Sequence, residues 1–149
     1  MKLAIGSDHA GLALKRELRR ALDERQLAVE DFGTHTDDSV DYPDFAARVG
    51  QAVSLGDCAM GVLVCGTGIG MSIAANKVRG VRAAVCTTEF EARMARAHND
   101  ANVLCLGSRV VGGGLANEIV AAFLDQKFEA GRHERRVQKI RDAEMQNER

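Results

Sequence analysis

The chain has 149 residues, of which 46% are hydrophobic and 28% are charged, as is usual for one soluble domain with a single core. Its formal net charge of -1 at pH 7 gives no electrostatic support for nucleic acid or an anionic membrane surface as the main partner. No apolar run is long enough to cross a membrane, and the first residues reach Asp8 and His9 too early for a signal peptide, so we expect one cytoplasmic domain over residues 1–149.

Strand-like and helix-like segments alternate along the first third of the chain. Residues 2–7 form a short apolar run, and residues 11–24 carry leucines at four-residue intervals opposite a charged face, which predicts an amphipathic helix. Residues 27–33 have the composition of a second strand. A polar loop follows, and Pro43 is well placed to begin the next helix.

The middle of the chain continues the alternation. Residues 59–65 form the most continuous apolar run, as expected for a strand covered on both faces. A glycine-rich stretch then leads into a short helix around residues 70–77, and residues 80–86 predict the fourth strand. Thr88 and Glu91 match the capping box of a further helix.

Residues 102–107 predict the fifth strand, and a helix follows it. The last helix, over residues 133–147, carries Val137 and Ile140 on an otherwise charged surface, and such a narrow apolar seam suits docking against a partner subunit. Five strands alternating with helices predict a three-layer α/β/α sandwich around a parallel sheet.

In such sheets, ligands bind beyond the carboxyl ends of the strands, and the residues expected there can carry chemistry. They are Ser7, Asp8 and His9 after the first strand, His35 and Tyr42 after the second, Cys65 and its glycines after the third, and Ser108 and Arg109 after the fifth. Polar loop ends are common, and Asp8 with His9 could simply cap a helix. A cysteine, a glycine loop and an Asp–His pair at one edge nevertheless favour a site.

The glycines at 66, 68 and 70 form a G-x-G-x-G loop, because position 71 is Met. That spacing, after the third strand, does not match a dinucleotide fingerprint, and no Gly-Lys-Ser/Thr follows as in a Walker loop. Two interpretations remain for the glycines alone. The backbone N–H groups of a strand-to-helix turn could bind an anion, either a phosphate or a developing oxyanion, or the glycines could only allow close packing.

Cys65 precedes this loop, where a helix N-terminus would stabilise a thiolate that acts as nucleophile or general base. A cysteine at a strand end more often has a packing role, but the glycine loop reverses that preference. Cys86 and Cys105 lie in apolar runs, and Cys58 looks more exposed. None of the four has zinc-site spacing, and free thiols fit a reducing compartment.

His98 and Asn99 precede the fifth strand, so we expect them at the opposite, amino edge of the sheet. They form either a solvated turn or part of a neighbouring subunit's site. Arg132 and Arg136 lie four residues apart on one helix face. They are either ordinary solvated charges or a pair suited to a phosphate.

Several motifs cover nearly the whole chain in a fixed order. They are IGSDHAG near the start, DYP at 41–43, CGTGIGMSIAANK at 65–77, GVRAAVC at 80–86, HNDANVLCLGSRVVG at 98–112 and GRHERRV at 131–137. In this combination the sequence resembles the ribose/galactose isomerase family, in its branch of type B ribose-5-phosphate isomerases. We see no departure from the family's pattern at a position that matters.

The resemblance implies a Rossmann-like sandwich that works as a homodimer or homotetramer, and an aldose–ketose isomerase that needs no metal or organic cofactor. The implied reaction interconverts ribose 5-phosphate and ribulose 5-phosphate, a step of the pentose phosphate pathway. After the furanose ring opens, a proton moves between C1 and C2 through an enediolate.

The resemblance also assigns roles to residues of this chain. Cys65 is the implied general base, with Thr67 beside it, and His98 is the implied acid that opens the ring, with Asp8 and Tyr42 near the ring oxygens. The implied enediolate contacts are the backbone amides of Gly66, Gly68, Ile69 and Gly70; the implied phosphate contacts are His9, Arg109, Arg132 and Arg136; and Asn99 is an implied sugar contact. Because His98 is expected at the amino edge, we predict that it enters the site from a partner subunit.

Two other functions compete with this one. The first is isomerisation of a hexose 6-phosphate, such as allose or galactose 6-phosphate. The galactose branch divides the motifs between two different chains, whereas this chain carries Cys65, His98 and Arg109 together, which favours the ribose type. The second is a non-catalytic sugar-phosphate sensor, which would have no need of the implied base and acid.

Overall fold

The structure, a computed structural model, describes residues 1–146. Its five strands are all parallel and lie in the order β2-β1-β3-β5-β4. The strands are β1 (Lys2–Ser7), β2 (Ala28–Asp31), β3 (Met60–Cys65), β4 (Ala83–Val85) and β5 (Val103–Gly107). The helices are α1 (Leu12–Glu24), α2 (Tyr42–Ser54), α3 (Ile69–Ala75), α4 (Glu89–Asn99), α5 (Gly113–Asp125) and α6 (Arg132–Gln146).

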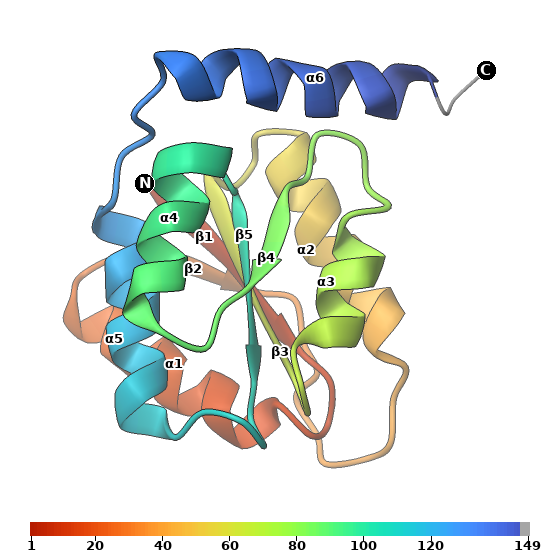
Figure 1. Cartoon of the computed structure of the whole chain (residues 1–149). Helices are drawn as coiled ribbons and strands as arrows, with labels where there is room; N and C mark the ends of the chain where they lie inside the picture. Colours follow the sequence, from red (N-terminus) through yellow and green to blue (C-terminus); the bar gives the residue numbers. More distant parts are fainter. Residues whose placement is uncertain (147–149) are drawn as a thin grey trace.

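Helices cover both faces of the sheet (Figure 1). On one face, Leu3 and Ile5 of β1 belong to a buried cluster with the apolar sides of α1, α4 and α5. On the other face, Ala4 of β1 and Cys65 of β3 belong to a second cluster with α2 and α3. Successive strand residues point to opposite faces, so continuous apolar runs are what a sheet buried on both faces requires.

The predicted alternation of five strands and six helices is confirmed, with differences at element ends. The glycine loop ends one residue earlier than predicted, because α3 begins at Ile69, and β4 holds only three residues at the edge of the sheet. Pro43 lies in the first turn of α2. The capping box of α4 is present, with the Glu91 backbone N–H donating to Thr88 Oγ1 at 3.2 Å.

Helix α6 crosses the end of the sheet from which the parallel strands start (Figure 1). It packs on its own chain: Val137 is fully buried, and the Glu144 carboxylate accepts a hydrogen bond from the Gly80 backbone N–H at 2.9 Å. Residue 147, the last of the predicted helix, lies outside the described residues. Docking of this helix on a partner stays a prediction, while Ile140 keeps 48% of its surface exposed.

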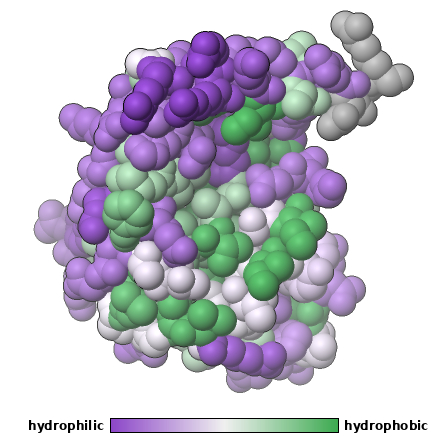
Figure 2. Space-filling view, in the orientation of Figure 1, coloured by the Kyte–Doolittle hydropathy of each residue, from purple (hydrophilic) through white to green (hydrophobic). Residues whose placement is uncertain are grey.

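The surface below α6 is apolar. Figure 2 shows a strongly hydrophilic α6 and, on the same face below it, a gathering of hydrophobic residues. Large exposed hydrophobic side chains on this part of the fold include Ile69 and Ile73 of α3 and Phe90 of α4, each at least half exposed. Among residues 1–146, no helix is long and apolar enough to span a membrane.

Candidate functional site

Cys65 ends β3, and the chain turns directly after it into α3. The thiol is almost fully buried, with 4% of the residue exposed. Its sulfur accepts a hydrogen bond from the Gly68 backbone N–H at 3.1 Å, and the Thr67 hydroxyl accepts one from the Ile69 N–H at 3.3 Å. The turn therefore directs a backbone donor at the sulfur, next to the positive end of a helix.

Gly68 is required by its backbone conformation and by a close backbone contact, and Gly66 and Gly70 pack closely against side chains. Gly68 has a φ of 79°, and a Cβ there would lie 2.9 Å from the carbonyl carbon of Leu106. A Cβ on Gly66 would lie 3.2 Å from a guanidinium nitrogen of Arg109, and one on Gly70 would lie 2.7 Å from the ring of Tyr42. The loop thus packs against β5, with the side chains of Arg109 and Tyr42 against it.

The loop after β5 is tied to the Cys65 loop by its backbone. The N–H of Ser108 donates to the carbonyl of Cys65 at 2.8 Å, and the N–H of Arg109 donates to the carbonyl of Gly66 at 3.0 Å. The Ser108 hydroxyl donates to the carbonyl of Ala10 at 2.8 Å. These bonds hold three loops of the carboxyl edge in one rigid arrangement.

Asp8 and His9 follow β1 at the same edge. The Asp8 carboxylate is 7% exposed and accepts a hydrogen bond from the Gly11 N–H at 2.9 Å, which closes a turn ahead of α1. His9 Nδ1 accepts a hydrogen bond from the Val40 N–H at 3.2 Å. A neutral imidazole that accepts at Nδ1 carries its proton on Nε2, so His9 can offer a donor to an anionic or hydroxyl ligand.

The other three cysteines are core residues. Burial raises the pKa of Cys86 to about 12 and raises the pKa values of Cys105 and Cys58. The expectation that Cys58 is more exposed is wrong, because only 1% of its surface is accessible. Its side chain turns into the cluster under α2 and α3.

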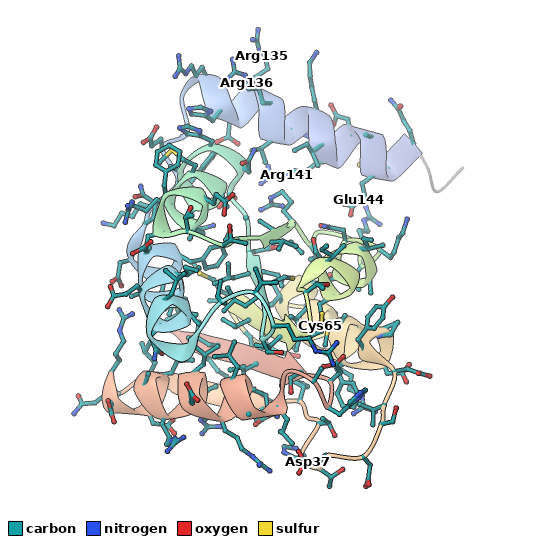
Figure 3. All side chains as sticks on the ribbon, turned by 60° about the horizontal axis from the view of Figure 1, so that its bottom comes forward. Asp37, Cys65, Arg135, Arg136, Arg141 and Glu144 are labelled. Atoms are coloured by element: carbon teal, nitrogen blue, oxygen red, sulfur yellow. The ribbon has the colours of Figure 1, made fainter. Side chains whose placement is uncertain are left out.

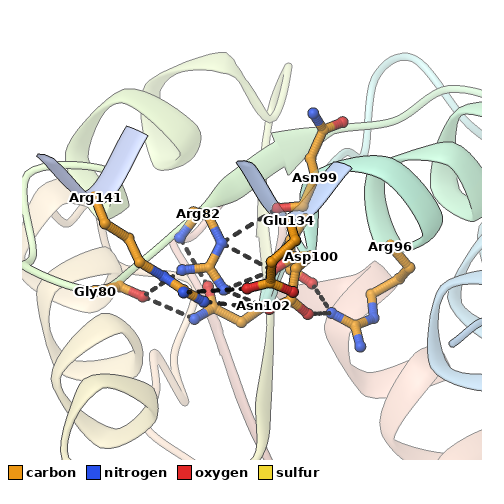
Figure 4. Close-up of polar contacts among 9 residues, drawn as sticks. Gly80, Arg82, Arg96, Asn99, Asp100, Asn102, Glu134 and Arg141 are labelled. Atoms are coloured by element: carbon orange, nitrogen blue, oxygen red, sulfur yellow. Dashed lines mark hydrogen bonds and ion pairs between the residues drawn. The ribbon is translucent and has the colours of Figure 1, made fainter. Parts of the chain in front are cut away.

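His98 and Asn99 end α4 at the opposite edge, as the sequence predicts. Asp100, in left-handed conformation with a φ of 46°, terminates that helix, and Arg82 and Arg96 hold its carboxylate at 3.0 and 2.9 Å (Figure 4). Arg82 also donates to the backbone carbonyls of Asn99 and Asp100. This network fixes the chain that carries His98 and Asn99.

Next to this turn, a cavity of about 720 Å³ opens between α6 and the edge strand β4. Asn99, Arg82 and Ile140 are among the residues that line it. Asn99, an expected sugar contact, therefore faces an open space at the amino edge.

The His98 ring stacks on the ring of His133, with centroids 4.2 Å apart and an interplanar angle of 11°. Glu129 lies beside both rings. Sequence patterns did not single out His133 or Glu129, because only the loop before α6 brings them to His98. The sequence signal that could have found them is the GRHERRV motif, which contains His133 and begins shortly after Glu129.

Arg132 and Arg136 lie exposed on α6. Figure 3 shows Arg136 near one end of α6, while Cys65 lies in the part of the molecule opposite to that helix. The expected site residues therefore form two groups in one chain. The carboxyl-edge group comprises Asp8, His9, Tyr42, Cys65, Gly66, Thr67, Gly68, Ile69, Gly70 and Arg109, and the amino-edge group comprises His98, Asn99, Arg132 and Arg136.

Comparisons with known proteins identify the family of the chain. Residues 3–140 match the model of the family described as Ribose/Galactose Isomerase. Ribose-5-phosphate isomerase B of Escherichia coli is 50% identical over 139 residues, which cover 93% of each chain.

Solved structures are similar over almost the full length. A ribose-5-phosphate isomerase B of Clostridium thermocellum is 56% identical with a TM-score of 0.98, covering 99% of both chains. The Mycoplasma genitalium enzyme with bound ribulose 5-phosphate is 46% identical with a TM-score of 0.93, covering 97% of this chain and 96% of that one. The fold, the motifs and these likenesses lead to one conclusion: the chain belongs to the ribose/galactose isomerase family.

Proposed function

We propose that this chain interconverts ribose 5-phosphate and ribulose 5-phosphate at a site built around Cys65, with the whole chain acting as one isomerase domain. The observation that carries the proposal is the Gly68 N–H directed at the Cys65 sulfur, at the same sheet edge as Asp8, His9 and Arg109. The relatives named above have this activity, and one of them was solved with ribulose 5-phosphate bound. The chain is accordingly an aldose–ketose isomerase.

Cys65 is suited to move a proton between C1 and C2. Removal of a proton next to a carbonyl builds negative charge on the carbonyl oxygen, and fixed backbone N–H groups stabilise that charge without reorganising. We assign this role to the amides of residues 66–70. In the structure the Gly68 and Ile69 amides donate to Cys65 Sγ and Thr67 Oγ1, so these two would exchange a bond within the loop for one to the substrate oxygen. We assign Asp8 and Tyr42, at the same edge of the sheet, to contacts with the sugar oxygens.

Ring opening needs a second group, and His98 has the required acid–base chemistry. It lies at the amino edge, across the sheet from Cys65 of the same chain, so the proposal places a partner copy's His98 and Asn99 over each Cys65. Two features support a homo-oligomer. Within residues 1–146 the short strand β4 is an edge strand that pairs only with β5, and hydrophobic residues gather on the face below α6 (Figure 2). The free, buried thiols suit a reducing compartment such as the cytoplasm.

The phosphate requires cations and donors that can form several charge-assisted hydrogen bonds. We assign this role to His9 and Arg109 of one copy with Arg132 and Arg136 of the other. Arg136→Ala is expected to raise KM for the sugar phosphate while kcat changes less, because the phosphate is remote from C1 and C2. Arg135→Ala, at a neighbouring exposed position on α6 (Figure 3), is the matched control. An unchanged KM in Arg136→Ala would contradict the assignment.

The substrate is tested by an isomerisation assay of the purified protein with ribose 5-phosphate and allose 6-phosphate. We expect turnover of ribose 5-phosphate with the higher kcat/KM. One additional carbon in the substrate is worth only about 1–3 kcal/mol in discrimination, so weaker turnover of the hexose phosphate is compatible with the proposal. Preference for allose 6-phosphate would support the competing hexose function, and binding without turnover would support the sensor.

A further inference from the structure

His98, Glu129 and His133 bring three metal-ligating groups together at the amino edge. The Nε2 atoms of His98 and His133 lie 3.9 and 3.8 Å from Oε2 of Glu129, and all three ligand atoms lie within 4.8 Å of one another. Both distances exceed hydrogen-bonding range. The two imidazoles thus flank one carboxylate oxygen without bonding to it directly.

The backbone holds these groups in place. The N–H of Glu129 donates to the carbonyl of Ala97 at 3.0 Å, which ties the loop before α6 to the residue preceding His98. The N–H of His133 donates to the carbonyl of Ala130 at 2.9 Å, at the start of α6. These main-chain bonds hold the backbone of the loop before α6 next to the end of α4, so the three side chains start from neighbouring positions.

The three side chains of the cluster differ in their exposure to solvent. His133 is 7% exposed, whereas His98 is 37% and Glu129 56% exposed, so the cluster is open to solvent on one side.

We propose that His98, Glu129 and His133 form a binding site for a divalent transition-metal ion of the Zn²⁺ type. Two imidazoles and one carboxylate, with a fourth position left for water, are a ligand set typical of zinc. Ligands at about 2.0–2.2 Å in tetrahedral geometry lie roughly 3.4 Å apart. The ligand atoms of the cluster lie up to 4.8 Å apart, so binding requires them to approach one another by up to about 1.4 Å. The exposed Glu129 carboxylate and a tilt of the His98 ring out of the stack can supply that movement.

The carboxylate is essential to this site. Arg132 and Arg136 lie near His133 and oppose a cation there, and Glu129 supplies the negative charge that compensates for them. We therefore expect the site to fail when Glu129 is neutralised, even though its oxygen is only one of three ligands.

A metal ion bound at this site would affect isomerisation, an expectation that rests on the proposed function. A metal ion at His98 Nε2 occupies the nitrogen that would exchange a proton with the sugar ring. Zinc should then inhibit isomerisation reversibly, and a chelator should restore it. The ion would be an inhibitor of the reaction and not a participant in it.

The binding test is direct and independent of activity. Equilibrium dialysis of the purified full-length protein against Zn²⁺ alone is expected to give one bound ion per chain at neutral pH. Glu129→Gln and His133→Asn should each weaken binding by about tenfold or more, since even outer-shell partners of a metal contribute 10–100-fold. Glu118→Gln, which changes an exposed glutamate on α5, is the matched control and should bind as the wild type does.

Cys65 is the competing ligand, because thiolates also bind zinc. Cys65→Ser must keep the site, and Co²⁺ substituted for zinc should give ligand-field bands without a sulfur charge-transfer band. Absence of stoichiometric binding, unchanged binding in Glu129→Gln, or loss of binding in Cys65→Ser would each overturn the proposal. If zinc binds through these residues and isomerisation continues, the metal site stands and the role of His98 in ring opening fails instead.

Discussion

Cys65 differs from the other cysteines in what its sulfur contacts and not in its exposure. All four thiols are buried, but the Cys65 sulfur accepts a backbone N–H from the loop that follows it. Cys86 and Cys105 lie where burial disfavours their thiolates. A buried, hydrogen-bonded sulfur at a strand end is a suitable base, because exclusion of water strengthens its electrostatic interactions with a substrate.

Cys65→Ala removes the proposed base and little else. We expect kcat for ribose 5-phosphate to fall by about 10²–10⁴-fold, the usual contribution of a positioned acid or base, while KM changes less. Cys58→Ala removes a thiol that is equally buried but distant from the loop, so it should retain turnover. Near-normal kcat in Cys65→Ala would refute the assignment of the base.

The thiols should also differ in reactivity toward iodoacetamide at pH 8. The pKa of Cys86, raised to about 12, means that its thiolate forms only near that pH in the folded protein, and Cys105 and Cys58 are shifted in the same direction. We expect peptide mapping by mass spectrometry to find Cys65 modified first, and bound sugar phosphate to protect it. Faster labelling of any of the other three would contradict this order.

Among the elements, the glycine loop is the one whose role the sequence left undecided. The spacing excluded dinucleotide and Walker sites but left an anion site and tight packing as alternatives. The structure contains the tight packing, because Gly66, Gly68 and Gly70 each lie against a neighbouring group. It also directs the Gly68 N–H at the Cys65 sulfur, and binding of an anion by this turn stays a prediction.

Gly68→Ala tests the loop. With a φ of 79° and the Leu106 backbone 2.9 Å from the added Cβ, the variant is expected to lose about 1–3 kcal/mol of unfolding free energy and much of its kcat, because the N–H moves away from the sulfur. Gly112→Ala, at a φ of -75° with no atom within 4 Å of the added Cβ, should be nearly neutral. Denaturant unfolding and turnover measure both effects; equal stability and turnover in the two variants would contradict the structure of the loop.

The alternation of elements and the capping of α4 could be predicted because local spacing determines them. Thr88 with Glu91 is a clear example. The length of β4 could not be predicted from the sequence, since it depends on which strand ends the sheet. The grouping of His98, Glu129 and His133 could not be predicted either, because it depends on the path of the loop before α6.

At the scale of the whole molecule, the expected site residues lie at opposite edges of one sheet. The carboxyl edge holds the proposed base and enediolate contacts, and the amino edge holds His98, Asn99 and the α6 arginines. A single chain therefore cannot bring Cys65 and His98 to one sugar. Two copies related by a twofold axis can form two such sites, because each contact between them occurs twice.

Subunit complementation distinguishes a site shared between two copies from a site within one chain. Cys65→Ala and His98→Asn copies, each inactive alone, are unfolded together and refolded as a mixture, and isomerisation of ribose 5-phosphate is measured. Random pairing makes half of the dimers mixed, and one of the two sites in each mixed dimer is intact. We therefore expect recovery of about one quarter of wild-type activity. Mixed dimers without activity, or a fully active monomer in gel filtration, would contradict it.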